Sequence, residues 1–268
     1  MQSSLTNILK NTQWFLISIV VLVAGCSISP LSRYPDFPEK KKEITSTFIL
    51  SDFVLMEAVA GDTVKIDVPE TKRYAKACMD YFAGKLNEKE LHVDRAILSS
   101  VGLMMDRNKK NLVIRSVEDR QSDVSQLSTV SPPYFEHEVF SRDTILAQLL
   151  RIVYSSLLGY EKSKSETSKN IPAAIHLGKA FGGSIMAVIF GIGYDSPVSY
   201  RLAVERASPK NKYETLSFDP VTQFTIMFYL IDIETGDIIW DDRAFMQGGT
   251  INMNKLTGMV DKIVAELP

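Results

Sequence analysis

Residues 184–194 form an almost wholly apolar segment, rich in residue types that favour strands. A strand that is apolar along its length has no side to turn toward water, so it must lie in a sheet with both faces covered. Gly182 and Gly183 precede the segment and allow the chain to turn into it. The sequence therefore predicts a central strand buried between layers.

Further strands are expected before this segment. Residues 45–60 are rich in Phe, Ile, Leu and Val and predict a first buried strand. Residues 96–105 and 111–117 resemble two more strands, separated by a polar turn, and such a pair could form a hairpin.

Three helices are predicted before the C-terminal part, the first two from apolar residues recurring at three- and four-residue intervals. The first spans 70–86 and places Cys78 on its apolar side, where a small buried hydrophobe is the expected role. The second follows Ser141, which can act as its N-cap. Its expected inward residues are Ile145, Leu146, Leu149, Ile152, Val153 and Leu157. The third is a shorter helix over 172–181.

The C-terminal part carries the strongest local pattern. Apolar strands over 224–233 and 238–245 flank a four-residue turn in which Gly236 can adopt a positive φ. A helix follows, with one apolar stripe that must pack onto the sheet; its members are Leu256, Met259, Val260, Ile263, Val264 and Leu267. The predicted fold class is therefore α/β (α+β): a mixed sheet flanked by helices, ending in a hairpin plus helix.

The N-terminus has the layout of a secretory signal. A polar start with Lys10 precedes an apolar run from Trp14 to Ala24, and Gly25-Cys26 follows. The apolar run is too short to span well, because a transmembrane helix needs about 20 apolar residues. Residues 23–26, Val-Ala-Gly-Cys, resemble the lipobox of bacterial lipoproteins, in which a peptidase cleaves before the cysteine.

This resemblance implies cleavage between Gly25 and Cys26, with acyl chains attached to Cys26. Two or three chains anchor stably, since each buried CH₂ contributes about 0.8 kcal/mol. An uncleaved anchor with an incidental cysteine, or a buried N-terminal strand, remains the alternative. Ser27 is not aspartate, which resembles the pattern sorted to the outer membrane, so we expect a periplasm-facing protein anchored there.

Three regions follow from this interpretation. Residues 1–25 are the lipoprotein signal peptide, 26–43 a flexible tether with prolines and a charge cluster, and 44–268 a single periplasmic α/β domain. The chain has 30 basic and 32 acidic residues, so its net charge does not favour nucleic acid as a partner.

The sequence shows no combination of residues that is typical of a catalytic site. His92, His137 and His176 lie in separate predicted elements, so we expect no metal site, and no motif calls for a cofactor. Asp241, Asp242 and Arg243 are expected to be surface charges, because adjacent strand residues point to opposite faces.

A polar interval over 118–141 is expected to be a long surface loop, and such loops in compact domains are often functional. It contains Pro132, Pro133, Tyr134 and Phe135, whose aromatic rings would be exposed if the loop is. These four residues are the candidate partner-binding surface.

Residues 230–245 read Leu-Ile-Asp-Ile-Glu-Thr-Gly-Asp-Ile-Ile-Trp-Asp-Asp-Arg-Ala-Phe. They resemble the late hairpin of the curli-secretion (CsgG-like) lipoproteins and of the related penicillin-binding-protein activator (LpoB-like) lipoproteins. The resemblance implies a periplasmic domain fold more than a channel, because two long amphipathic strands that would build a pore are not identifiable.

The expected function is therefore non-enzymatic. The protein would bind other envelope proteins as part of a secretion, surface-assembly or cell-wall complex. The alternative is a self-associating subunit of a curli-type outer-membrane secretion pore. A hydrolytic enzyme would need one of the histidines or Asp241 for its activity.

Overall fold

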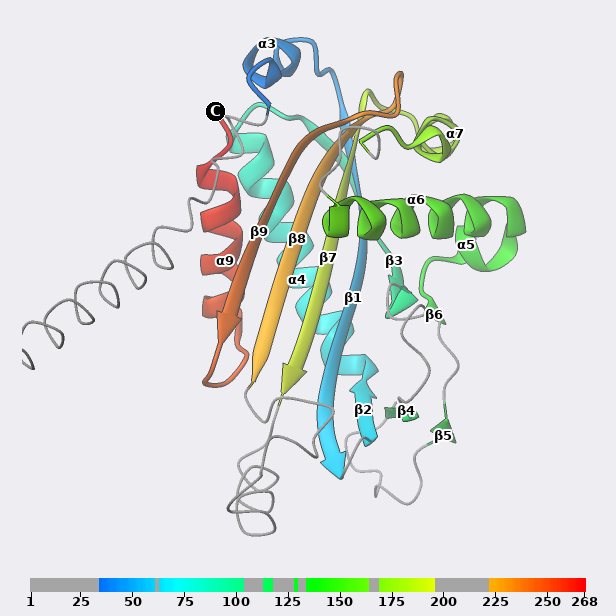
Figure 1. Cartoon of the computed structure of the whole chain (residues 1–268), viewed down its shortest axis with the longest axis vertical. Helices are drawn as coiled ribbons and strands as arrows, with labels where there is room; N and C mark the ends of the chain where they lie inside the picture. The colour runs from blue at the N-terminus through cyan, green and yellow to red at the C-terminus, as the bar shows by residue number, and fades with distance from the viewer. Residues whose placement is uncertain are drawn as a thin grey trace, which may run out of the picture.

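The computed structural model describes residues 34–60, 63–103, 113–117, 128–129, 134–163, 169–195 and 222–268. These residues form a mixed sheet of nine strands, seven of them in the order β5-β4-β2-β1-β7-β8-β9, with β3 beside β1 and β6 beside β3 (Figure 1). The strands are β1 (Thr47–Ala60), β2 (Thr63–Asp67), β3 (Val93–Val101), β4 (Val113–Val117), β5 (Ser128–Thr129), β6 (Tyr134–Phe135), β7 (Ile185–Asp195), β8 (Gln223–Asp232) and β9 (Ile238–Gln247).

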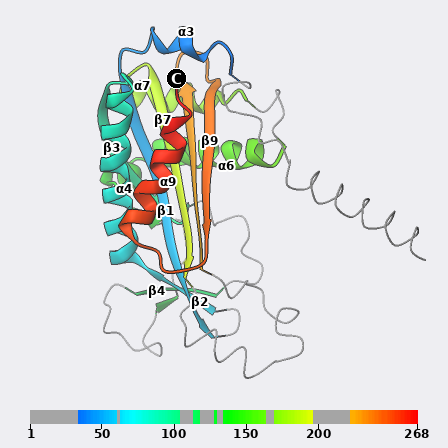
Figure 2. The ribbon, with the colours of Figure 1, turned by 90° about the vertical axis from the view of Figure 1, so that its left-hand side faces the viewer.

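Helices cover both faces of the sheet. They are α3 (Phe37–Lys41), α4 (Val68–Glu88), α5 (Glu138–Arg142), α6 (Thr144–Ser163), α7 (Pro172–Phe181) and α9 (Met253–Ala265). The helices α4 and α9 lie side by side on one face, and α6 crosses the other (Figures 1 and 2). The predicted fold class, a mixed sheet flanked by helices with a C-terminal hairpin plus helix, is confirmed. Within the described part of the chain, no helix is both long and apolar enough to cross a membrane.

The predicted central strand is β7, and it is buried along almost its whole length. It pairs with β1 in parallel and with β8 in antiparallel orientation. A Cβ added at Gly191 would lie 2.3 Å from ring carbons of Phe53, its partner on β1. The glycine therefore leaves room for an aromatic ring of the neighbouring strand.

We expect the substitution Gly191→Ala to lower the free energy of unfolding by about 1–3 kcal/mol, because overpacking forces side chains and backbone to shift. The control is Gly84→Ala at an exposed position near the C-terminal end of α4, where the new Cβ would meet no atom of another element within 4 Å. There we expect a gain of about 0.5–1 kcal/mol from helix propensity. Urea denaturation measures both, and equal effects at the two sites would contradict this account.

The predicted C-terminal hairpin is β8 and β9. Gly236 in its turn has φ +79°, and the carboxylate of Asp232 accepts a hydrogen bond from the N–H of Glu234. The predicted final helix is α9, which begins after the N-cap Asn252 and packs on β9, β8 and α4. Its predicted apolar stripe is buried.

The hairpin predicted from 96–105 and 111–117 is wrong. Strand β3 pairs in parallel with the first half of β1, and β4 pairs in parallel with β2, which in turn pairs with the second half of β1. Because β1 is 14 residues long, the same edge of it pairs with β3 along its first half and with β2 along its second half. A polar turn between two strands does not decide whether they pair with each other.

The helix predicted after Ser141 is α6, but its N-cap is two residues later: Asp143 accepts hydrogen bonds from the N–H groups of Ile145 and Leu146. The expectation that Ile145 and Ile152 face inward is wrong, since they are 68% and 51% exposed. The buried side chains are Ala147, Leu150, Val153, Tyr154, Leu157 and Tyr160. A helix lying across a sheet buries one stripe, and these two isoleucines fall outside it.

The interval 118–141 is not a continuous loop, because it contains β5, β6 and most of α5; residues 118–127 and 130–133 lie outside the described residues. The tether predicted over 26–43 is also too long. Tyr34 and Phe37 are buried, and α3 spans Phe37–Lys41 within that range. The apolar side of this short segment packs on the domain, so the folded body extends at least to Tyr34.

Candidate functional site

The residues predicted to carry function are only partly described by the structure. Gly25, Cys26, Pro132 and Pro133 lie outside the described residues, and Tyr134 is described only as backbone in β6. The predictions of cleavage and acylation therefore stay predictions.

Phe135, the remaining member of the predicted binding surface, is half-buried. Its ring lies 6.4 Å from that of Phe140, and the guanidinium of Arg151 lies 5.4 Å from its centre. The ring therefore contributes to packing between β6, α5 and α6.

The segment from Tyr34 to Phe37, which follows the predicted anchor, packs against the edge strand β9. The ring of Phe37 lies 4.9 Å from that of Trp240 and the ring of Tyr34 lies 6.0 Å from it, and all three side chains are buried. The ammonium of Lys169 lies 4.9 Å from the centre of the Tyr34 ring. We call this contact of Tyr34 and Phe37 with β9 the clasp.

A buried carboxylate completes the clasp. The hydroxyls of Tyr34 and Tyr160 donate hydrogen bonds to Asp241 Oδ1 over 2.5 and 3.1 Å, and the two hydroxyl oxygens are 2.8 Å apart. Burial, and then the charge of Asp241, raise the pKa of Tyr34 well above its usual value, so the hydroxyl stays protonated and donates.

The expectation that Asp241 is a surface charge is wrong, because only 3% of it is exposed. Its two tyrosine partners come from the N-terminal segment and from α6, both distant in sequence. The presence of an acidic residue beside Trp240 in an apolar strand is the signal that could have suggested a buried, hydrogen-bonded carboxylate.

A second buried carboxylate was also missed. Asp52 lies within the apolar run of β1 and is fully buried; its Oδ1 accepts hydrogen bonds from the hydroxyl of Ser100 at 2.7 Å and from the N–H of Leu103 at 3.0 Å. It therefore fixes the chain where β3 ends, which is a structural role.

The histidines do not come together. His137 accepts a hydrogen bond from the N–H of Val139 at the start of α5, His92 precedes β3, and His176 is exposed on α7. Among the described residues no group of three or more His, Cys, Asp or Glu side chains could hold a metal ion. The thiol of Cys78 is buried as predicted, and burial raises its pKa to about 12.

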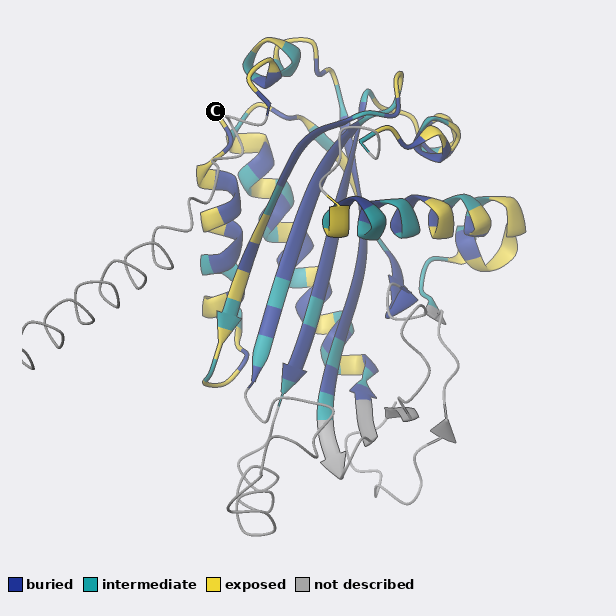
Figure 3. Ribbon diagram, viewed as in Figure 1, coloured by how far each residue is buried: buried dark blue, intermediate teal, exposed yellow. Residues whose placement is uncertain are grey.

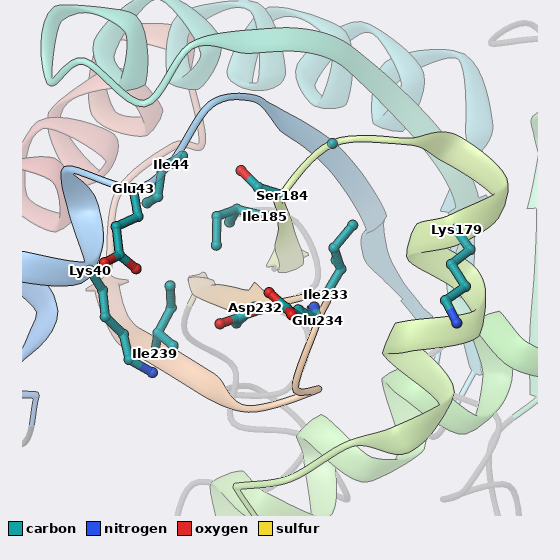
Figure 4. Close-up of a pocket in the computed structure, with 11 residues that line it drawn as sticks. Lys40, Glu43, Ile44, Lys179, Ser184, Ile185, Asp232, Ile233, Glu234 and Ile239 are labelled. Carbon is teal, nitrogen blue, oxygen red and sulfur yellow. Dashed lines mark hydrogen bonds between the residues drawn. The ribbon is translucent and has the colours of Figure 1, made fainter.

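A pocket of about 400 Å³ lies between the segment after α3, the start of β7 and the β8–β9 turn (Figure 4). Isoleucines form its apolar lining: Ile44, Ile185, Ile233 and Ile239. The charged side chains of the lining are Lys40, Glu43, Lys179, Asp232 and Glu234, and Gly183 and Ser184 also line the pocket. Figure 4 shows the Asp232 and Glu234 carboxylates in the middle and Lys179 to one side on α7. Such a lining suits an apolar group with polar or charged ends.

The clasp and the pocket share the segment around α3. Tyr34 lies eight residues after Cys26, and a fully extended chain gains at most ~3.6 Å per residue, so Cys26 can be at most about 29 Å from Tyr34. Any group held by Cys26 therefore stays near this end of the domain.

No protein-family model and no curated protein sequence matches the chain. Among solved structures, PelC from Paraburkholderia phytofirmans, crystallised as a dodecamer, aligns with 9% identity over 81% of this chain and 85% of that one, with a TM-score of 0.29. A variant of the same protein gives 8% identity, 82% and 88% coverage and a TM-score of 0.29. Lipoprotein GNA1162 from Neisseria meningitidis aligns with 13% identity over 83% of this chain and 96% of that one, with a TM-score of 0.30. TM-scores of this size do not establish a shared fold.

Proposed function

We propose that this protein is a lipid-anchored component of a bacterial cell envelope, which binds other envelope proteins and does not catalyse a reaction. The observation that carries the proposal is the clasp, which fixes Tyr34 to β9 only eight residues after Cys26. Acyl chains on Cys26 would hold the folded body within about 29 Å of the bilayer. A protein tied so closely to a surface acts on what lies at that surface.

The proposal also includes the membrane to which the protein is anchored. Ser27 after the acylated cysteine favours the outer membrane over the inner one, and export through a signal peptide places the domain in the periplasm.

The pocket is the binding site that the proposal assigns to a partner. Its lining of four isoleucines can hold apolar side chains of an extended segment, while Glu234 in the middle of the pocket and Lys179 to one side can pair with charges of that segment. Most of the charged side chains that line the pocket are exposed. Of the four isoleucines, Ile233 is partly exposed and the others are buried. This arrangement supports recognition of a peptide segment more than chemistry on a small substrate.

The anchor is tested with Cys26→Ser. We expect the parent protein to remain with the membrane fraction and to show acyl chains on Cys26 by mass spectrometry, and the variant to become soluble or to keep its leader. Cys78→Ser is the matched control, since its thiol is buried and has no part in anchoring. An unmodified Cys26 in native protein would refute the anchor.

The binding site is tested on the same membranes with the double variant Lys179→Glu and Glu234→Lys, which conserves net charge. Both side chains are exposed, so the fold should tolerate the exchange. We expect copurifying envelope proteins to be reduced about tenfold, since two misplaced charges cost a protein interface more than 1.4 kcal/mol. Exposed Lys76 and Asp80 on α4, exchanged in the same way, form the control. Unchanged copurification with the pocket variant would remove the pocket from the proposal.

A further inference from the structure

The exposed apolar side chains of the described residues lie on one face of the molecule. Among the described residues, the large hydrophobic side chains that are exposed are Ile145 (68%), Ile152 (51%) and Phe245 (54%). The first two lie on α6. Phe245 lies on the same face as α6, because side chains of β9 alternate and both Asp241 and Arg243 contact α6. Figure 3 shows exposed residues along the outer side of α6.

Helix α6 carries two apolar sides. Its buried stripe packs on the sheet, and Tyr154 contacts the ring of Phe190 at 4.8 Å. On another side, Ile145, Leu149 and Ile152 follow one another at four- and three-residue intervals, which places them in one row. Leu149 is half-buried and continues the row into the core. A second apolar row is not needed to hold the helix on the sheet, so it needs another explanation.

Long basic side chains accompany this row. Arg142, Arg151 and Lys162 are exposed at the start, middle and end of the α5–α6 segment. Arg142 pairs with Glu138 at 3.0 Å, and Arg151 lies over Phe135. Side chains of this type bury their methylene stems along apolar surface while the charge stays at the level of polar headgroups. Exposed isoleucines beside arginine and lysine are typical of a helix that lies in a membrane interface.

Tyr34, the described residue nearest in sequence to Cys26, lies on this face. The Tyr34 hydroxyl lies 2.8 Å from that of Tyr160, near the C-terminal end of α6, and both bond to Asp241 on the α6 side of β9. The 20 residues of α6 extend over about 30 Å at 1.5 Å per residue, close to the maximum reach of the residues between Cys26 and Tyr34. A bilayer that holds Cys26 is therefore within reach of the whole helix.

We infer that the α6 face rests on the bilayer to which Cys26 is attached, with Ile145, Ile152 and Phe245 in the boundary between headgroups and acyl chains. This inference rests on the proposed lipid anchor. A partner protein with an apolar groove would suit the same side chains, but it would have to fit between the domain and the membrane on the anchored side. The lipid surface is already there, and the short tether keeps it at high local concentration.

The inference is tested by tryptophan fluorescence in vesicles of phosphatidylethanolamine and phosphatidylglycerol with brominated acyl chains. Ile152→Trp adds a reporter to the α6 face, and Lys76→Trp adds one to α4 on the opposite face, where the lysine side chain is 79% exposed. The native Trp240 is fully buried and supplies the same background in both variants. Bromine quenches only at short range, so we expect quenching at position 152 to be several-fold stronger than at position 76. Thermal melting confirms that each variant is folded.

Two further measurements separate this inference from the anchor. Vesicle flotation and mass spectrometry report whether the protein is acylated and bound. If it is, equal quenching at the two positions overturns the inference and leaves the anchor standing. If Cys26 is found unmodified, its thiol can be coupled to a maleimide lipid, because Cys78 is buried and its pKa is raised, and the same quenching is measured. Shielding of position 152 that needs added envelope proteins would assign the face to a protein partner and refute the lipid surface.

Discussion

Replacement of Trp240 by alanine should lower the free energy of unfolding by about 3–5 kcal/mol, the cost of removing a large buried aromatic side chain. Its indole is fully buried and contacts both aromatic rings of the clasp. Trp240→Phe should cost roughly half of that or less, since it keeps a ring in place. Among the described residues, the indole N–H has no hydrogen-bond acceptor, so the phenylalanine breaks no hydrogen bond. Urea denaturation measures both variants.

In Trp240→Ala, the clasp should also open before the rest of the domain unfolds. Trypsin cleaves after lysine, and α3 holds Lys40 and Lys41, with Lys42 directly after it. We expect these bonds to be cut faster in Trp240→Ala than in the parent or in Trp240→Phe, under conditions in which the sheet stays folded. If trypsin cuts the three proteins at this segment equally fast, the clasp does not hold the N-terminal segment.

Alkaline pH should unfold this protein steeply above about pH 10. Burial raises the pKa of Tyr34, Tyr154 and Tyr229, and their neighbouring carboxylates raise it further. The unfolded chain releases these protons near pH 10, whereas the folded protein keeps them. The stability they support is therefore complete below pH 10 and is lost as the pH rises above it. Each tyrosine contributes about 1.4 kcal/mol per pH unit, so three contribute about 4 kcal/mol per unit.

This dependence is measured by urea denaturation between about pH 8 and pH 11. The control is Tyr34→Phe, which removes one titrating group and should reduce the slope above about pH 10 by roughly a third, at the cost of a hydrogen bond to Asp241. Titration of all tyrosines near pH 10 in the folded state, seen by their ultraviolet absorbance, would show that these hydroxyls are not held as the structure describes.

The clasp connects the predictions for Trp240 and for alkaline pH with the proposed function. With the clasp closed, the described fold begins at Tyr34, eight residues after the proposed anchor at Cys26. If the clasp opens, the part of the fold nearest to Cys26 is β1, which begins at Thr47, and the maximum distance from Cys26 to the fold grows from about 29 to about 76 Å. Variants that open the clasp should therefore also weaken the proposed contact between the α6 face and a bilayer.

Local patterns in the sequence determine much of this protein. The apolar run of β7, the glycine turn between β8 and β9 and the stripe of α9 each depend on residues close in sequence, and all three predictions are confirmed. Periodicity reports which side of an element is apolar, because strands repeat every two residues and helices every 3.6. The lipobox around Cys26 belongs to the same kind of signal, although it remains a prediction.

Only the tertiary structure decided which elements meet. Asp241 is read from the sequence as a surface charge, yet Tyr34, 207 residues away, covers it and donates a hydrogen bond. The expected hairpin of β3 and β4 does not form, because β3 pairs with the long strand β1 and β4 pairs with β2. Ile145 and Ile152 fit an inward stripe by spacing but remain exposed. Each outcome depends on a partner far along the chain, and spacing within one segment carries no information about that partner.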